Sequence, residues 1–268
     1  MDKRAYIMNR LQEHYNFVAS QGYNIFAVML HGSQNYQLDE YSDKYMSDID
    51  SKAIIIPSLD DLILNKEYSY THVTELTEHI DIKDIRSIFN TLKKQNITYL
   101  EILFTEYYII NPLYEAFFKE LINNKEKIIK ISKDKFIATM CGHALQKAKN
   151  YNHMAPHSEK AIAKYGYDPK ELHHLLRLKE FCERFILEQE DFATCLIPRD
   201  MGQMKRIKQG LEYTYEEAIE QVAIAKTWIE DFKAKVFEPW PEEFAGGAEF
   251  LDDLAYRVIR KTIEAELK

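Results

Sequence analysis

Residues 47–57 read SDIDSKAIIIP, so two aspartates lie directly before a run of small and β-branched side chains. Such a run with a proline at its exit is typical of a strand. Asp48 and Asp50 are two residues apart, and the two-residue period of a strand puts their side chains on one face. Adjacent carboxylates repel each other unless the face is solvated or a cation lies between them. Mg²⁺ suits that position, because it prefers oxygen ligands and is usually held by carboxylates together with substrate phosphates.

The preceding strand indicates a phosphate site. Residues 25–33 read IFAVMLHGS, an apolar run short enough for a buried strand that ends at Gly32 and Ser33. Glycine lets the backbone approach a phosphate closely, and the serine hydroxyl and amide can donate hydrogen bonds to it. A buried strand, a Gly-Ser turn and then an Asp-x-Asp strand therefore predict phosphate donors beside metal ligands. Two-metal transfer of a phosphoryl or nucleotidyl group uses such an arrangement.

A third carboxylate is expected on a later strand. Residues 78–83 alternate polar and apolar side chains, as a half-exposed strand does. Asp81 lies on the polar face of this strand and could bind the metal or act as general base toward an acceptor hydroxyl. Its alternatives are Glu78, which points to the opposite face if the strand already begins there, and Asp84, which suits the N-cap of the next helix.

The chain as a whole is expected to be α+β. We predict an N-terminal α/β domain over residues 1–112 and a C-terminal helical bundle over residues 113–268. Residues 34–46 are expected to form a loop, and neither helix nor strand is favoured for residues 98–110. Apolar residues at helical spacing predict helices over 4–20, 113–131, 133–151, 168–190 and 214–236, with a last one after Gly246-Gly247.

One predicted helix carries a basic face. Asp168 followed by Pro169 is typical of a helix start. On this helix Lys170, His174 and Arg177 fall at i, i+4 and i+7 and share a side. Arginine offers a phosphate a fork of donors, lysine a point charge and histidine a switchable donor. The alternative explanation is an ordinary solvated helix face, just as a solvated strand entry or turn is the alternative for the two aspartates.

Composition limits the partners. The 268 residues carry a formal charge of −8, whereas a protein that coats nucleic acid non-specifically is usually basic, so any such contact must be local. The three cysteines are odd in number and widely spaced, which excludes a disulfide framework or zinc knuckle. No signal peptide and no apolar run of about 18 residues is present, so we expect a cytoplasmic protein without a membrane partner.

These motifs together resemble the DNA polymerase beta superfamily of nucleotidyltransferases, and within it the predicted RNA-repair type of bacteria and phages. The resemblance touches most of residues 25–180. This chain departs from the family in having Gln37 where glycine is usual and a longer loop before Ser47. Ser42-Asp43 is a rival metal motif, but no apolar strand follows it directly. The matching residues are Gly32-Ser33, Tyr36, Ser47-Asp48-Ile49-Asp50, Asp81, Asn96, Glu101 and the segment 165–177.

The resemblance implies a catalytic domain with a small mixed sheet and a helical domain that completes the nucleotide and acceptor cleft. An acceptor would attack the α-phosphate of an NTP, with ATP the expected nucleotide, and release pyrophosphate. The acceptor could be an RNA 3′ end, a protein hydroxyl or a small molecule. The implied site is Asp48, Asp50 and Asp81 on Mg²⁺ (or Mn²⁺), Gly32 and Ser33 on the terminal phosphates, and Lys170, His174 and Arg177 around the nucleotide.

Two other functions fit the same residues. A catalytically silent module could bind nucleotide on this fold for regulation, because a fold does not determine a function. A toxin–antitoxin component could instead transfer AMP to a partner protein. The loss of Asp81 from the metal cluster would favour the silent module, and label from ATP appearing on protein rather than RNA would favour the toxin–antitoxin component.

Overall fold

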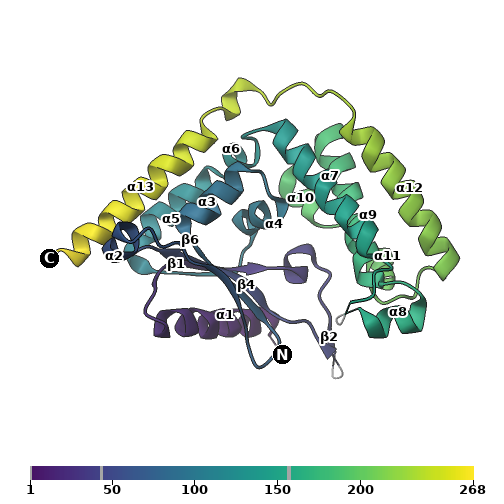
Figure 1. The fold of residues 1–268 in the computed structure, drawn as a ribbon, viewed down its shortest axis with the longest axis horizontal. Coiled ribbons are helices and arrows are strands. Elements are labelled where there is room, and N and C mark those ends of the chain that lie inside the picture. Colours follow the sequence, from purple (N-terminus) through teal and green to yellow (C-terminus); the bar gives the residue numbers. More distant parts are fainter. Residues whose placement is uncertain (1, 43–44, 156–157) are drawn as a thin grey trace. The chain divides into compact units, whose positions relative to one another are not determined.

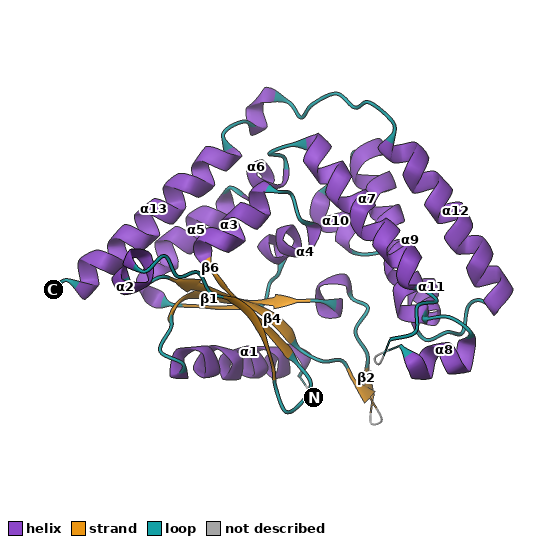
Figure 2. Cartoon of the chain, viewed as in Figure 1, coloured by secondary structure: helices purple, strands orange, loops and turns teal. Residues whose placement is uncertain are grey.

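The structure is a computed structural model that describes residues 2–42, 45–155 and 158–268. The chain divides into two compact units. The α/β unit comprises Met1–Asn35, Asp39–Ser132 and Trp240–Lys268, and the helical unit comprises Tyr36–Leu38 and Lys133–Pro239. All the strands of the described residues belong to the α/β unit (Figure 2). The protein is therefore α+β with a small mixed sheet and a helical C-terminal region, as predicted from the sequence.

The α/β unit is built on a five-stranded sheet with the order β5-β6-β4-β1-β7. β4 runs parallel to β6 and antiparallel to β1, while β5 and β7 pair antiparallel at the two edges. A separate two-stranded ribbon is formed by β2 and β3. The strands are β1 Asn24–His31, β2 Tyr41–Ser42, β3 Tyr45–Met46, β4 Asp50–Ile56, β5 Ser69–Val73, β6 His79–Asp84 and β7 Tyr108–Ile110.

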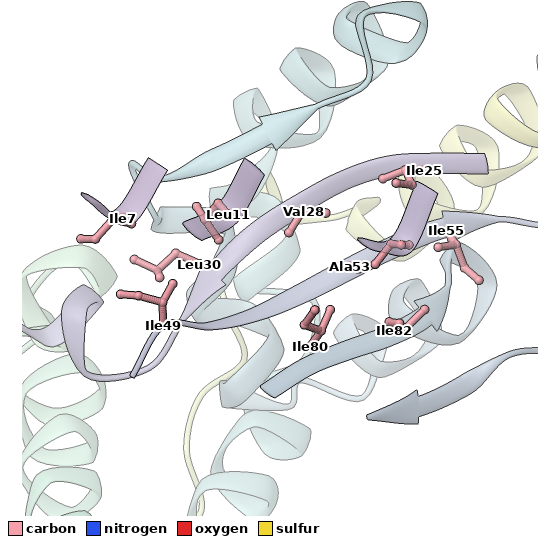
Figure 3. Close-up of a cluster of buried hydrophobic side chains, with 11 residues drawn as sticks. Ile7, Leu11, Ile25, Val28, Leu30, Ile49, Ala53, Ile55, Ile80 and Ile82 are labelled. Carbon is pink, nitrogen blue, oxygen red and sulfur yellow. The ribbon is translucent and has the colours of Figure 1, made fainter. Parts of the chain in front are cut away.

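One face of the sheet packs against the first helix, α1 (Lys3–Ser20), which lies along it in Figure 1. Ile7 and Leu11 of α1 meet aliphatic side chains of three strands (Figure 3). All of these side chains are at most 2% exposed, so this layer forms a core that the hydrophobic effect stabilises. The strand residues of this layer are Ile25, Val28, Leu30, Ala53, Ile55, Ile80 and Ile82, with Ile49 just before β4.

Helices cover the opposite face of the sheet (Figure 1). Asp84 caps α3 by accepting a hydrogen bond from the Arg86 amide, as expected, and Ile85, Ile88 and Phe89 of this helix are buried. Helix α13 packs against α3, α5 and α6. The helical elements of this unit after α1 are η1 Ser33–Tyr36 (except Tyr36, which belongs to the helical unit), α2 Leu59–Ile63, α3 Ile85–Lys93, α4 Ile97–Leu100, η2 Glu101–Phe104, η3 Pro112–Tyr114, α5 Glu115–Asn123, α6 Lys125–Ile129, η5 Glu242–Phe244 and α13 Gly247–Glu266.

The helical unit is organised around α9, which packs against α7, α11 and α12. Its centre contains four phenylalanine rings whose centroids lie 5.1–6.4 Å apart, namely Phe136, Phe181, Phe185 and Phe192. Such ring pairs add to the stability gained from burial. The elements are α7 Lys133–Asn150, α8 Glu159–Tyr165, α9 Pro169–Cys182, a π-helical turn η4 Glu183–Leu187, α10 Phe192–Leu196, α11 Met201–Lys208 and α12 Tyr215–Lys233. In the described residues, no helix has the length and apolar composition needed to cross a membrane.

The structure differs from the predicted organisation in three places. The α/β unit extends beyond residue 112, because α5 and α6 belong to it and α13 returns to pack on it from the end of the chain. The expected loop over 34–46 contains the β2–β3 ribbon, although Asp43 lies outside the described residues. The ambiguous segment 98–110 resolves into helical turns followed by β7. The first of these differences depends on contacts between residues far apart in sequence, since α13 packs against α3, α5 and α6.

A charged network links α1 to the sheet. Glu78 is 2% exposed and accepts hydrogen bonds from Arg10 Nε and Nη2 at 2.5–3.2 Å. His14 connects it to β4, because Nε2 lies 3.1 Å from the Glu78 carboxylate and Nδ1 lies 2.9 Å from Ser51 Oγ. Burial raises the pKa of Glu78, but hydrogen bonds from His14 and Arg10 outweigh burial and leave that pKa below its ordinary value.

We predict that Glu78→Gln lowers the free energy of unfolding by about 3 kcal/mol at pH 7, because the largely buried Arg10 charge then keeps only the exposed Glu13 as a partner. Glu78 has a lowered folded-state pKa, so its contribution is complete above the unfolded pKa near 4.5 and is lost as the pH falls through the folded value. Urea unfolding of both proteins between pH 3 and 7 measures this difference.

Glu13→Gln is the matched control, because Glu13 contacts the same Arg10 but its side chain is 59% exposed. An exposed pair of this kind contributes less than about 1 kcal/mol. An equal loss of stability in the two variants would contradict the assignment of the buried pair as the stabilising contact.

Candidate functional site

Polar side chains gather on the sheet face that points away from α1. In the parallel β4–β6 pair Lys52 lies beside Asp81, and in the antiparallel β1–β4 pair His31 lies beside Asp50. Paired residues point to the same face, and residues two apart share a face. We call the set His31, Asp50, Lys52, His79, Asp81 and Lys83 the polar face.

The Gly-Ser turn and the Asp-x-Asp motif meet at the end of β1. Gly32 has a φ of +106°, which L side chains rarely adopt, and a Cβ added there would lie 4.0 Å from Asp50 Oδ2. Asp50 Oδ1 accepts a hydrogen bond from the His79 amide at 2.8 Å and lies 3.1 Å from His79 Nδ1. Gln34 Nε2 donates to the Asp48 carbonyl at 2.5 Å and ties the turn to the second motif. The turn and Asp50 are therefore adjacent, as predicted.

The position of Asp48 differs slightly from the predicted one. β4 begins at Asp50, so Asp48 precedes the strand and is exposed, while Ile49 between them is fully buried against α1. Exposure still alternates with a period of two across the motif. In the described part of the chain, no hydrogen bond or ion pair engages the Asp48 carboxylate. Asp48 and one oxygen of Asp50 thus remain available to a ligand.

Asp81 has several partners of its own. Its Oδ2 lies 3.2 Å from Lys52 Nζ and accepts a hydrogen bond from the Tyr99 hydroxyl at 2.5 Å, and Lys83 Nζ is 3.8 Å away. Burial raises the pKa of Asp81, yet Lys52, Tyr99 and Lys83 outweigh it and lower that pKa below the ordinary value. Burial in turn lowers the pKa of Lys52, and Asp81 offsets part of that effect. Asp81 and Lys52 therefore each favour the charged form of the other.

The alternatives to Asp81 have the structural roles expected of them. Glu78 points to the α1 face, where it binds Arg10 and His14. Asp84 is fully buried, caps α3 and pairs with Arg86. Asp81 is therefore the carboxylate among these three that shares the polar face with Asp50.

The donor set fits a divalent cation only in part. Asp48 and Asp50 offer hard oxygen atoms beside a glycine turn, which suits Mg²⁺. Asp81 does not fit as well, because its carboxylate already holds Lys52 and Tyr99. Across residues 2–42, 45–155 and 158–268, no group of three or more His, Cys, Asp or Glu side chains is arranged to hold a metal ion.

In the helical unit, α9 presents the predicted basic residues in very different surroundings. Lys170 is exposed, His174 is partly buried, and Arg177 is only 7% exposed. The Arg177 guanidinium lies 3.8 Å from the centre of the Tyr36 ring. Its Nε and Nη1 atoms are buried and have no hydrogen-bond partner within the described residues. Buried guanidinium nitrogens without an acceptor are costly, so this position favours an anionic ligand.

His173 belongs to the same cluster, although the sequence did not indicate it. It is 2% exposed, and neither ring nitrogen has a partner among the described residues. Burial lowers the pKa of His173 to about 3, helped by the nearby charges of Arg177, Lys208 and Lys170. Burial also lowers the pKa of His174 well below its ordinary value. Both rings are therefore neutral at pH 7, so each offers one donor and one acceptor.

Sequence reasoning also missed Lys52 and Tyr99. Lys52 could have been noticed, because it follows Asp50 by two residues and must share its face on a strand. Tyr99 gave no such signal, since its position over the sheet depends on how α4 packs. His31 and Glu101 form a further contact on this face, with Nε2 and Oε1 2.8 Å apart.

Comparisons with known proteins do not identify a relative. No protein-family model matches the chain, and no curated protein matches it. The resemblance to nucleotidyltransferases therefore rests on the sequence motifs alone.

We predict that Gly32→Ala destabilises the protein by about 2 kcal/mol, because alanine is strained at a φ of +106°. The methyl group itself has room, since its nearest neighbours would be 3.8 and 4.0 Å away. Gly142→Ala is the control, because Gly142 lies in α7 with open space around it and should gain about 0.5–1 kcal/mol. Urea unfolding of both variants checks the opposite signs.

A second prediction concerns the buried Arg177 guanidinium on α9. Arg177→Met should weaken pyrophosphate binding about tenfold or more, because a hydrogen bond to a charged group contributes about 1.5–3 kcal/mol. Isothermal titration calorimetry measures the affinity. Arg206→Met provides the control, since Arg206 is 52% exposed and already pairs with Glu212. Equal affinities in the wild type and Arg177→Met would show that the guanidinium does not meet the anion.

Proposed function

We propose that this protein is a metal-dependent nucleotidyltransferase that moves a nucleoside monophosphate from an NTP to an acceptor and releases pyrophosphate. The observation that carries the proposal is the proximity of the Asp50 carboxylate to the Gly32 turn, where a Cβ added to the glycine would lie 4.0 Å from Oδ2. A phosphate approaching the turn backbone would thereby come next to a carboxylate that can hold a cation.

The residues of the α/β unit have distinct proposed roles. Asp48 and Asp50 would hold Mg²⁺ or Mn²⁺, which would neutralise phosphate charge and activate the attacking oxygen. The backbone of Gly32 and the hydroxyl of Ser33 would bind the terminal phosphates. His79 keeps the Asp50 carboxylate oriented through its amide at 2.8 Å, so the second oxygen stays directed toward the turn.

The helical unit supports a phosphate-rich ligand independently. Arg177 and His173 are buried polar side chains. Arg177 Nε and Nη1 and both ring nitrogens of His173 lack hydrogen-bond partners within the described residues. Lys170 and Lys208 add positive charge around them. An oxyanion would give these donors the acceptors that they lack, and a triphosphate has several. The same observation also fits a nucleotide-binding module without catalysis, and so does the engagement of the Asp81 carboxylate by Lys52 and Tyr99. The test must therefore separate binding from transfer.

The test supplies each labelled NTP with Mg²⁺ or Mn²⁺ to the protein, together with RNA and with protein from a cell lysate. We expect label on one acceptor pool and release of pyrophosphate. Asp48→Ala and Asp50→Ala should each reduce transfer about 100-fold or more, since a bound metal contributes several kcal/mol to such reactions. Asp60→Ala is the control, because Asp60 is an exposed aspartate at the start of α2.

The outcomes separate the candidate functions. Label on RNA identifies an RNA-modifying enzyme, and label from ATP on protein identifies an AMP-transferring one. Nucleotide binding without transfer to any pool would favour the silent regulatory module. Transfer that persists in both the Asp48 and the Asp50 variants would remove the proposed mechanism.

A further inference from the structure

The partners of Asp81 conflict with a role as metal ligand. One of its oxygens, Oδ2, is shared by Lys52 Nζ at 3.2 Å and the Tyr99 hydroxyl at 2.5 Å, and Thr71 lies 3.5 Å from the other. A divalent cation on this carboxylate would have to displace an ammonium that is already in place. Asp50, by contrast, directs Oδ2 toward the Gly32 turn.

Displacing Lys52 would be costly. Its side chain is only 7% exposed, so removing Asp81 as its partner would leave a buried positive charge. The geometry of the sheet also resists the change, because Lys52 and Asp81 are direct neighbours in the parallel β4–β6 register. The sheet register therefore fixes the Lys52–Asp81 ion pair, which differs from a mobile ion pair on the surface.

Tyr99 holds the pair from above the sheet. Its ring lies 4.1 Å from Lys52 Nζ and 4.6 Å from Lys83 Nζ, measured to the ring centre, while its hydroxyl donates to Asp81. Contacts of cations with an aromatic face are attractive, and they strengthen when water is excluded. Carboxylate, ammonium and phenol thus restrict one another to a single arrangement.

We propose that Asp81 does not bind the metal but positions Lys52, whose ammonium is the second, permanent cation of the site. This inference rests on the proposed function. Asp48 and Asp50 then supply the protein ligands of a single divalent cation. Lys52 lies two residues from Asp50 on the same face of β4, about 7 Å along the strand. A fixed positive charge at that distance offsets the repulsion between Asp50 and Asp81 and favours a polyphosphate nearby.

The first test counts metal ions directly. Mn²⁺ is titrated into the full-length protein without nucleotide, and free Mn²⁺ is followed by electron paramagnetic resonance. We expect one ion per chain, a dissociation constant that Asp81→Asn raises no more than severalfold through the unpaired Lys52 charge, and at least tenfold weaker binding in Asp50→Asn. Asp60→Asn serves as the control for a distant carboxylate. In Lys52→Met, Asp81 loses its ammonium partner, and Mn²⁺ should bind severalfold more tightly than in the wild type.

The results separate this inference from the proposed function. If Asp81→Asn weakens Mn²⁺ binding as strongly as Asp50→Asn does, Asp81 is a metal ligand and the inference fails while the function stands. If Asp48→Asn, Asp50→Asn and Asp81→Asn all leave Mn²⁺ binding unchanged, both the inference and the proposed function fail. Two ions per chain in the wild type would likewise overturn the single-metal assignment.

A second test needs no metal. The midpoint of urea unfolding is measured with EDTA for Asp81→Asn, for Lys52→Met and for the double variant. Asp81→Asn should unfold at a lower urea concentration than the double variant, because only the single variant leaves a buried ammonium without its carboxylate. If every variant folds and the midpoint change of the double variant equals the sum of the two single changes, Asp81 does not position Lys52.

Discussion

The register of β4 with its two neighbours is the constraint on which the rest of the α/β unit depends. Pairing with β1 sets Asp50 beside His31 and close to the Gly32 turn, while parallel pairing with β6 sets Lys52 beside Asp81. A slip of one residue would turn every side chain of the strand to the other face. The buried aliphatic residues on the α1 face prevent such a slip, since it would move them among the charges.

The alternation of side chains along the strands therefore places apolar residues on one face of the sheet and charged residues on the other. Its α1 face is mainly apolar, and the polar residues on it include Glu78 and Ser51, which reach Arg10 and His14. Its other face carries a group of carboxylates, lysines and histidines below Tyr99. The most buried charges of this second face, Lys52 and Asp81, form an ion pair, because partly buried groups lose the solvation that would otherwise stabilise them. Function and stability draw on the same rule here: a buried charge needs a partner.

The helical unit contains the opposite case, namely buried polar groups that lack hydrogen-bond partners among the described residues. Arg177 is buried against Tyr36, yet two of its guanidinium nitrogens have no acceptor in the described structure, and the neighbouring His173 has no partner for either ring nitrogen. A core that excluded ligands would be more stable with apolar residues at these positions. Their presence is understandable if an anion completes the hydrogen bonds, which agrees with the phosphate chemistry proposed for the Gly32 turn.

The sequence by itself determined the features that depend on neighbours in the chain. Alternation and apolar runs located β1, β4 and β6, residue type and spacing singled out Gly32, Asp48, Asp50 and Asp81, and the cap at Asp84 followed from its place before a helix. Only the tertiary structure decided which groups meet. It paired Asp81 with Lys52 and Tyr99, buried His173 and Arg177, and joined α13 to the α/β unit. Such contacts join residues tens to hundreds of positions apart, and local propensity contains no information about them.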